Sequence, residues 1–303
     1  MPSPAIESMN CQRTGLLKYG FVAPALLLLI ALNVFPLLYN VVLSFTDAEL
    51  SVGGFRFVGG ANYREVFSGA RFAVALRTTA VFVAAAVSAE LLLGFCLALA
   101  LREPFRGKAA VLTVLLIPMM LSPAVMGLYW NLILNGHYGV LNQLLAAAGL
   151  PQPQWLTDPA LKLVSVLVID VWMWTPFMML ISLAGLNSIP RHLYEAAEID
   201  RAGRWMVFRR ITLPMCAPLL VLAVLFRATD ALKQFDLVMA ITGPNDASTQ
   251  TLSTLLYQVM FRAEKVGLGS AYACVVLVIV IAVAAVFIRY IDLIQARQGK
   301  GQA

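Results

Sequence analysis

The sequence has little charge and few of the side chains that build catalytic and metal sites. Of its 303 residues only 13% are charged, whereas about 25% are charged in soluble domains. Hydrophobic residues make up 60% of the chain, and the mean hydropathy is +0.82. This composition excludes an ordinary water-soluble fold and predicts a chain that resides in a membrane.

Cysteine and histidine are also scarce, and neither forms a cluster. The four cysteines are far apart and contain no C-x-x-C pair, so we predict neither a zinc site nor a disulfide framework. The two histidines are expected on opposite sides of the membrane, so no metal site is predicted. The net charge of +6 does not indicate nucleic-acid binding, because basic residues in membrane proteins report orientation first. The residues concerned are Cys11, Cys96, Cys216, Cys274, His137 and His192.

Six long apolar runs dominate the remaining sequence. Each is long enough to cross about 30 Å of hydrocarbon as a helix, and lipid tolerates no unpaired backbone. The first run is too long to be the apolar part of a cleavable signal peptide. We therefore predict an all-α integral membrane fold of six transmembrane helices, near residues 19–45, 72–101, 109–134, 161–186, 214–242 and 269–291.

Lysine and arginine in the connections predict the orientation of these spans. One face collects most of them, and we assign it to the cytoplasm, together with both termini: Arg13, Lys18, Arg102, Arg106, Lys108, Arg191, Arg201, Arg204, Arg209, Arg210, Arg297 and Lys300. The expected division is a cytoplasmic segment 1–18, a membrane domain 19–295 and a cytoplasmic tail 296–303. The external connections, rich in Pro, Gly and Asn, predict compact caps with short helices.

The most charged stretch, EAAEIDRAGRWMVFRRITLP, begins at Glu195 and interrupts the apolar pattern. Ser188 and Pro190 predict the start of a short helix that Gly203 ends. A second short helix is expected to reach Pro214, where the fifth span begins. Periodicity alone favours an amphipathic element at the lipid headgroups, with arginines facing anionic lipid.

This stretch and the four residues after it, MCAP, resemble the EAA loop of binding-protein-dependent ABC importer permeases. The matching positions are Glu195, Ala196, Ala197, Asp200, Ala202, Phe208, Ile211, Leu213, Pro214 and Pro218. One departure is Arg201, where the family usually has glycine, and we expect Gly203 to serve the bend instead. The segments FVGGANYREVF, LIPMMLSPAVMGLYW, GVLNQLL, DVWMWTPFMMLISLAGL and LFRATDALKQFDLVMAITGP resemble the sugar and polyol branch of that family. Thr242 is followed by a single Gly243 before Pro244, where family members often have a double glycine.

This resemblance implies a type I ABC importer transmembrane fold in the cytoplasmic (inner) membrane. It implies a permease that forms half of a pathway for a sugar, polyol or glycerol phosphate. The implied partners are a cytoplasmic ATPase dimer, a second homologous permease and an external solute-binding protein. The implied coupling loop covers residues 189–213, and its contact residues would be Glu195, Ala196, Ala197, Asp200, Arg201, Ala202, Gly203 and Phe208.

The chain has no G-x-x-x-x-G-K-[ST] loop for nucleotide phosphates. Gly107 and Lys108 lack the upstream glycine and are followed by Ala109. We therefore expect no cofactor and no enzymatic site in this chain, with ATP and Mg²⁺ bound by the partner ATPase.

Ionisable residues inside spans are costly and usually mark pairs or pathways. Arg227, Asp230, Lys233 and Asp236 recur at i, i+3 steps in the predicted fifth span. We expect Arg227 to pair with Asp230, and Lys233, Gln234 and Asp236 to line a polar cavity.

In the fourth span, Asp170 is expected either to pair with Arg227 or Arg77, or to accept hydrogen bonds from a sugar that stacks on a tryptophan. The full set of candidate pathway residues is Trp130, Asn131, Asp170, Trp172, Trp174, Lys233, Gln234 and Asp236. Prolines inside spans free carbonyls and kink helices, which predicts hinges at Pro118 and Pro123.

Two other classes of protein remain open from the residues alone. An ion-coupled secondary transporter would use intramembrane acids, for which Asp170 and Asp236 are the only candidates. An integral membrane enzyme would need a clustered acid, base, nucleophile or metal set, and the sequence shows none.

Overall fold

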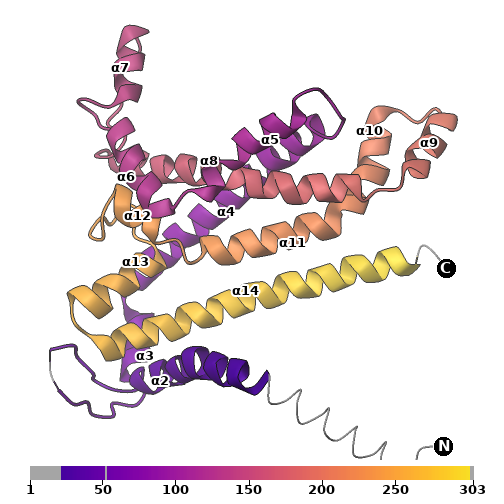
Figure 1. The fold of residues 1–303 in the computed structure, drawn as a ribbon. Helices are drawn as coiled ribbons and strands as arrows, with labels where there is room; N and C mark the ends of the chain where they lie inside the picture. Colours follow the sequence, from indigo (N-terminus) through magenta and orange to yellow (C-terminus); the bar gives the residue numbers. More distant parts are fainter. Residues whose placement is uncertain (1–21, 52, 301–303) are drawn as a thin grey trace, which may run out of the picture. The chain divides into compact units, whose positions relative to one another are not determined.

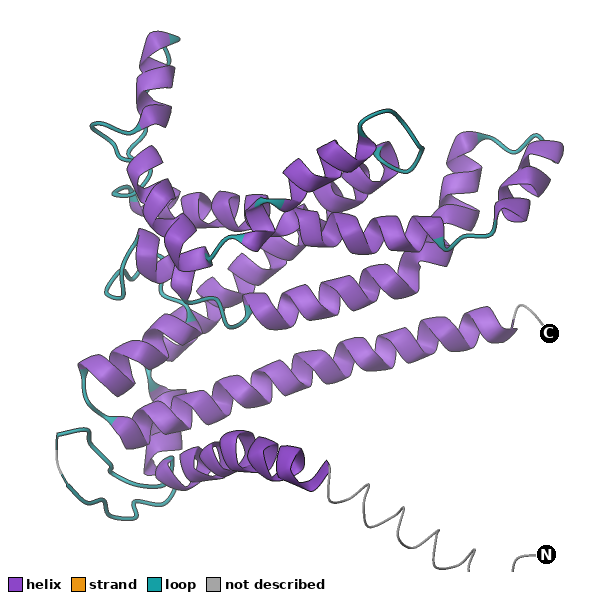
Figure 2. Cartoon of the chain, in the orientation of Figure 1, coloured by secondary structure: helices purple, strands orange, loops and turns teal. Residues whose placement is uncertain are grey.

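A computed structural model describes residues 22–51 and 53–300, with side chains as far as residue 293. Within these ranges the protein is helical, and Figures 1 and 2 show helices joined by loops. The described residues contain no strand, only an isolated bridge between Thr46 and Phe57. The all-α prediction is confirmed. The predicted segment 1–18, the start of the first span and residues 301–303 lie outside the described residues, as do the side chains of Arg297 and Lys300.

Five helices are long and apolar enough to cross a membrane: Val22–Leu43, Ala70–Ala100, Pro159–Asn187, Arg204–Ala231 and Val266–Leu293. The predicted third span is also helical, but it is not one continuous helix. It consists of α5 (Lys108–Leu116), the 3₁₀ turn η2 (Pro118–Met120) and α6 (Pro123–Ile133). The breaks fall at the two prolines predicted as hinges, because proline lacks an N–H and its ring clashes with the preceding turn.

Two other prolines are accommodated without a break. The π-helix η1 (Ile30–Val34) precedes Pro36 in α2 (Phe35–Leu43), and the π-helix η3 (Phe208–Thr212) precedes Pro214 in α11 (Leu213–Ala231). A wider turn gives room for the proline ring while the helix continues. The short helix α10 (Arg204–Val207) therefore runs through η3 into α11, and the predicted separation at Pro214 is wrong.

The described chain divides into two compact units. The first covers residues 1–66 and 259–275, and the second covers residues 67–258 and 276–303. Helices α3 (Ala61–Ser68) and α14 (Val266–Lys300) contribute to both units, and α13 (Leu252–Tyr257) is followed by the π-helix η4 (Gln258–Arg262).

In the first unit, Asn62 and Tyr63 of the segment FVGGANYREVF hold the loop after α2 in place. The Asn62 side-chain amide donates to the carbonyls of Ser44, at 2.9 Å, and Thr46, at 2.8 Å. The Tyr63 hydroxyl lies 2.8 Å from Ser44 Oγ. The start of α14 joins this loop, since the Gly267 N–H donates to the Ala48 carbonyl. Asn62 and Tyr63 therefore have a structural role.

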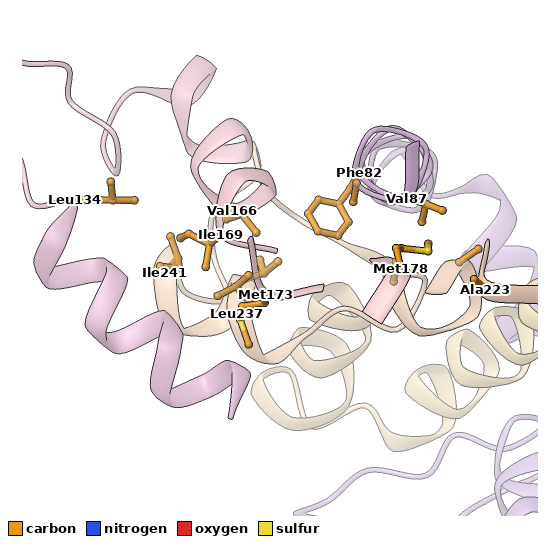
Figure 3. Packing of buried hydrophobic residues seen from close by; sticks show 14 residues of the cluster. Phe82, Val87, Leu134, Val166, Ile169, Met173, Met178, Ala223, Leu237 and Ile241 are labelled. Atoms are coloured by element: carbon orange, nitrogen blue, oxygen red, sulfur yellow. The ribbon is translucent and has the colours of Figure 1, made fainter. Parts of the chain in front are cut away.

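In the second unit, α4 (Ala70–Ala100) packs along α8 (Pro159–Asn187), and α11 packs against both. Figure 3 shows the apolar core between these helices, with Phe82, Val87, Met178 and Ala223 among its members. At Gly94 the helices α4 and α8 approach closely. A Cβ placed there would lie 2.6 Å from Met178 Cβ and 2.7 Å from the Met179 backbone nitrogen.

One predicted cap is a compact loop built around a buried asparagine. It carries the short helix α7 (Val140–Ala147), as expected for this connection. Asn142 accepts a hydrogen bond from Trp155 Nε1 at 2.8 Å and donates to the carbonyl of Pro153 at 3.0 Å. These bonds close the loop onto the start of α8.

An ion pair ties the first turns of α8 to the loop after α12 (Asp236–Ile241). Lys162 Nζ contacts Asp246 Oδ2, and the Ser248 N–H donates to Asp246 Oδ1 at 2.9 Å. Burial acts to raise the pKa of Asp246, but the hydrogen bonds from Lys162 and Ser248 outweigh it, so the pKa lies below its usual value. The folded protein therefore favours the ionised carboxylate.

We predict that Asp246→Asn lowers the stability of this region by about 1 to 3 kcal/mol at neutral pH, because it removes the charge partner of Lys162. A carboxylate with a lowered folded pKa contributes stability above its unfolded pKa, near 4, and loses it as pH falls through the folded value. The difference between the melting temperatures of wild type and variant should thus be constant from pH 5 to 8 and should shrink as the pH falls below about 4. A difference independent of pH would show that the ion pair does not stabilise the loop.

Candidate functional site

The largest buried charged side chain in the second unit is that of Arg227 on α11, whose exposed fraction is 2%. Its guanidinium contacts three carboxylates from three helices. Nε lies 2.8 Å from Glu90 Oε2 on α4, and Nη1 lies 3.2 Å from Asp230 Oδ2 on α11. Nη2 contacts Asp170 Oδ2 on α8. All three guanidinium nitrogens are therefore paired, and we call Glu90, Asp170, Arg227 and Asp230 the charged cluster.

Two further side chains complete the surroundings of the charged cluster. Gln234 Nε2 donates to Asp170 Oδ1 at 2.7 Å, so both oxygens of Asp170 accept a bond. The Arg227 guanidinium carbon lies 5.0 Å from the centre of the Trp174 ring, within the range of a cation–π contact. Glu90 Oε1 is buried and has no hydrogen-bond partner among the described residues.

A cavity of about 430 Å³ adjoins the charged cluster and is lined by Trp174, Phe177, Phe226, Arg227 and Asp230. Asp230 is the carboxylate that faces open space, because its side chain is 52% exposed whereas those of Glu90 and Asp170 are not exposed. Aromatic rings can stack on the apolar face of a sugar ring, and a carboxylate beside them can accept hydrogen bonds from its hydroxyl groups. We call this space the aromatic cavity.

The structure joins some of the predicted pathway residues and separates others. Asp170 pairs with Arg227, not with Arg77, which is exposed, and the expected pairing of Arg227 with Asp230 is present. Lys233 and Asp236 are exposed and have no contact with the charged cluster. The predicted i, i+3 series fails because α11 ends at Ala231 and α12 begins only at Asp236.

The remaining predicted residues lie elsewhere in the second unit. Trp130 and Trp172 pack edge to face, with ring centres 5.6 Å apart. Asn131 donates to the Ile241 carbonyl at 3.2 Å, which ties α6 to α12. Neither Trp130 nor Trp172 lines the aromatic cavity, so of the predicted tryptophans Trp174 alone does so.

Glu90 is the member of the charged cluster that the sequence analysis missed. It lies in the middle of the second span, and an ionisable residue at such depth was itself a signal for a buried partner. Sequence periodicity within one helix does not show which charges on separate helices meet.

The stretch predicted to be cytoplasmic forms α9 (Arg191–Ile199), a turn, and α10. The turn is a Schellman motif, in which the Ala202 N–H donates to the Ala197 carbonyl at 2.9 Å and the Arg201 N–H to the Glu198 carbonyl at 3.0 Å. Arg201 occupies the left-handed position of this motif, with φ of 53°. The expectation that Gly203 makes the bend is therefore wrong, since Gly203 is extended and precedes α10.

We predict that Arg201→Gly stabilises the protein by about 1 kcal/mol, because glycine adopts left-handed backbone conformations without the penalty that Cβ imposes. The melting temperature of the purified protein measures this gain. The matched control is Arg204→Gly, in the first turn of α10, which should destabilise. A loss of stability in Arg201→Gly would mean that the arginine side chain stabilises the turn.

The candidate coupling residues differ in exposure. Glu195, Ala196, Asp200, Arg201 and Gly203 are exposed. Ala197 is buried against its own chain, so the expectation that both alanines face a partner is wrong for Ala197. Phe208 packs on Phe95, with ring centres 6.1 Å apart, and Ala202 is half-buried.

Two large apolar side chains accompany these exposed charges. Ile199 is 82% exposed and Trp205 is 70% exposed. Apolar groups surrounded by polar ones are typical of protein interaction sites. Within the part of the chain that the structure describes, no group of three His, Cys, Asp or Glu side chains is placed to hold a metal ion.

Long apolar helices around a buried charged cluster, with a charged helical loop outside the spans, define a multi-pass α-helical membrane protein. Residues 90–298 match the family model of the binding-protein-dependent transport system inner membrane component, and the chain belongs to that family. It is thus the permease component of an ABC importer, a transport subunit and not an enzyme.

Curated relatives agree over nearly the whole chain. A probable ABC transporter permease from Sinorhizobium fredii is 36% identical, covering 88% of this chain and 86% of its own. A trehalose/maltose transport system permease from Thermococcus litoralis is 32% identical, with 91% and 94% covered. A sulfoquinovosyl glycerol transport system permease from Agrobacterium fabrum is 34% identical, with 91% and 90% covered.

Among solved structures, a chain of a bacterial alginate ABC transporter, in complex with an alginate pentasaccharide-bound periplasmic protein, is similar in fold. The TM-score is 0.80 at 21% identity, with 92% of this chain and 94% of that chain covered. This likeness confirms the fold class.

Proposed function

We propose that this chain forms half of the translocation pathway for a sugar, polyol or glycerol-phosphate-type solute. Support comes from relatives named for trehalose, maltose and sulfoquinovosyl glycerol transport. The second half of the pathway is a homologous permease. An external solute-binding protein delivers the solute, in keeping with the periplasmic protein in the alginate transporter complex.

The observation that carries the solute assignment is the aromatic cavity. Trp174, Phe177 and Phe226 supply ring faces, and the half-exposed Asp230 supplies an acceptor for hydroxyl groups. Asp170 and Gln234 lie behind this surface and support Arg227. The solute contacts are therefore Trp174 and Asp230, and Lys233 and Asp236 take no part.

The energy for transport comes from ATP, bound with Mg²⁺ by a cytoplasmic ATPase dimer that docks on residues 189–213. The exposed Glu195, Ala196 and Arg201 lie beside Ile199 and Trp205, which gives the ATPase both charged and apolar contacts. Charges at the edge of such an interface set register and orientation. The break between α5 and α6 at Pro118 and Pro123 supplies a hinge for alternating access.

This arrangement requires the loop to face the cytoplasm, and both termini lie on the same side. The chain then comprises a cytoplasmic segment 1–18, a membrane domain 19–295 and a cytoplasmic tail 296–303. Membrane lipid surrounds the domain.

We predict that Glu195→Lys abolishes capture of the ATPase or reduces ATP-driven transport at least tenfold, because a reversed charge at a desolvated contact costs several kcal/mol. The tagged chain would be purified from its native membrane and the proteins that accompany it identified. Wild type should bring down an ATPase and a second permease. Glu49→Lys, an exposed charge reversal outside the loop, is the matched control and should retain both. A wild-type chain that emerges alone, even after crosslinking, would contradict the proposal.

A further inference from the structure

Arg227 is the only buried cation among the described residues of the second unit, and carboxylates outnumber it three to one. Asp230 is half-exposed and pairs with Nη1, so a carboxyl group lies beside the guanidinium at the cavity wall. Three carboxyl groups surround one guanidinium, so the charged cluster has no excess of cationic groups.

The hydrogen bonds point in the same direction. An anionic solute would bind guanidinium N–H groups, and three of the five, one on each of Nε, Nη1 and Nη2, are directed at carboxylate oxygens. Both oxygens of Asp170 accept bonds, from Arg227 and Gln234, which is the pattern of an ionised carboxylate. A phosphate or carboxylate that reached the other two N–H groups would lie beside these carboxylates, whose negative charge opposes its binding.

We propose that Asp170 and Asp230 make the aromatic cavity selective for uncharged polyhydroxylated solutes and exclude anionic ones. This inference rests on the proposed function and narrows its solute class, since it excludes a glycerol phosphate. Asp230 acts at the cavity wall. Asp170 is a positioning residue, because it is buried and acts through Arg227, whose guanidinium it pairs with.

The charge of the cavity can be measured without knowing the solute. Phe226 lines the cavity and is 56% exposed, so Phe226→Cys places a thiol there. In the assembled transporter, with the native Cys11, Cys96, Cys216 and Cys274 replaced by serine, this thiol is treated with a cationic or an anionic methanethiosulfonate reagent. Each rate is divided by the rate at which the same reagent reacts with the free thiol of 2-mercaptoethanol.

The cationic reagent should react faster, and Asp170→Asn should lower the cationic-to-anionic rate ratio by roughly fivefold to tenfold, the effect of one charge at about 10 Å. Asp230→Asn should lower this ratio as well. It serves as the second variant if Asp170→Asn fails to fold, because it leaves no buried group unpaired. Asp170→Glu should keep the wild-type ratio. Glu103→Gln, an exposed charge removal in the connection after α4, is the control and should also keep it. A ratio at or below one in wild type, a ratio unchanged in both asparagine variants, or no reaction with either reagent would overturn the proposal.

A matched pair of solutes separates this inference from the proposed function. Trehalose and trehalose 6-phosphate would be compared for equilibrium binding to the same transporter without binding protein. Wild type should favour trehalose, and Asp170→Asn should raise the relative affinity of the phosphate ester about tenfold. If neither sugar binds while the thiol rates behave as expected, the carbohydrate assignment fails and the charge selectivity stands. If wild type binds the phosphate ester as well as trehalose, the charge selectivity fails and the carbohydrate assignment stands.

Discussion

Arg227→Ala is expected to lower the free energy of unfolding by about 3 to 5 kcal/mol and to deplete the protein from the membrane. The variant leaves Glu90 and Asp170 buried without their common cation, and uncompensated buried charge is among the most destabilising changes known. The effect exceeds that of a lost hydrogen bond because α4 and α8 both lose a partner on α11. Thermal unfolding of the detergent-solubilised protein, with the yield of monodisperse material, measures the loss.

A neutral replacement of the cluster distinguishes charge from packing. The triple variant Glu90→Gln, Asp170→Asn and Arg227→Gln removes all the buried charge and keeps similar volumes. We expect it to recover more than half of the stability that Arg227→Ala loses, since no ion remains unpaired. Equal losses in the two variants would mean that the shape of the arginine side chain, not its charge, holds the three helices together.

The second large effect is expected from Gly94→Ala, which adds one methyl group where α4 crosses α8. The new Cβ would lie 2.6 Å from Met178 Cβ and 2.7 Å from the Met179 backbone nitrogen, so the backbone must shift. Such overpacking costs about 1 to 3 kcal/mol, which exceeds the gain of roughly 0.5 to 1 kcal/mol from replacing a helical glycine.

Gly185→Ala on α8 is the matched control for this change. A Cβ at Gly185 would meet its nearest neighbour, Cys216 Sγ, at 3.5 Å, an ordinary van der Waals contact. This variant should be as stable as wild type or slightly more stable. If both alanine variants melt at the wild-type temperature, the helices at Gly94 are less closely packed than the structure indicates.

Much of the fold could be predicted from the sequence because lipid restricts the choices. A long apolar run must be helical in a membrane, and five predicted spans therefore coincide with long apolar helices. Whether a proline breaks a helix is harder to predict from the sequence, because it depends on the conformation of the neighbouring turns. Pro118 and Pro123 break the third span, whereas Pro36 and Pro214 follow π-helical turns within helices that continue.

The candidate site was only partly predictable, for a related reason. A periodic pattern places residues on one helix face, so the pairing of Arg227 with Asp230 followed from their i, i+3 spacing. The pattern does not reveal that α11 stops at Ala231, which removes Lys233 and Asp236 from that face. Nor does it reveal contacts between helices, and Glu90 was missed for that reason.

In the loop of residues 189–213, the motif residues predicted where the loop lies in the sequence but not its backbone conformation. Arg201 stands where glycine is usual, and we expected the bend to move to Gly203. The Schellman hydrogen bonds fix the left-handed position at Arg201 instead, so the backbone geometry is kept at the cost of strain in this residue.

We propose that this permease is driven by ATP through a partner ATPase and not by an ion gradient. The most direct test is solute uptake by proteoliposomes that contain the complete purified transporter, with its binding protein on the outer side. Uptake should require ATP at the ATPase, persist when proton and sodium gradients are collapsed, and fall at least tenfold in Glu195→Lys but not in Glu49→Lys. Uptake that needs a gradient and continues without ATP would contradict the account.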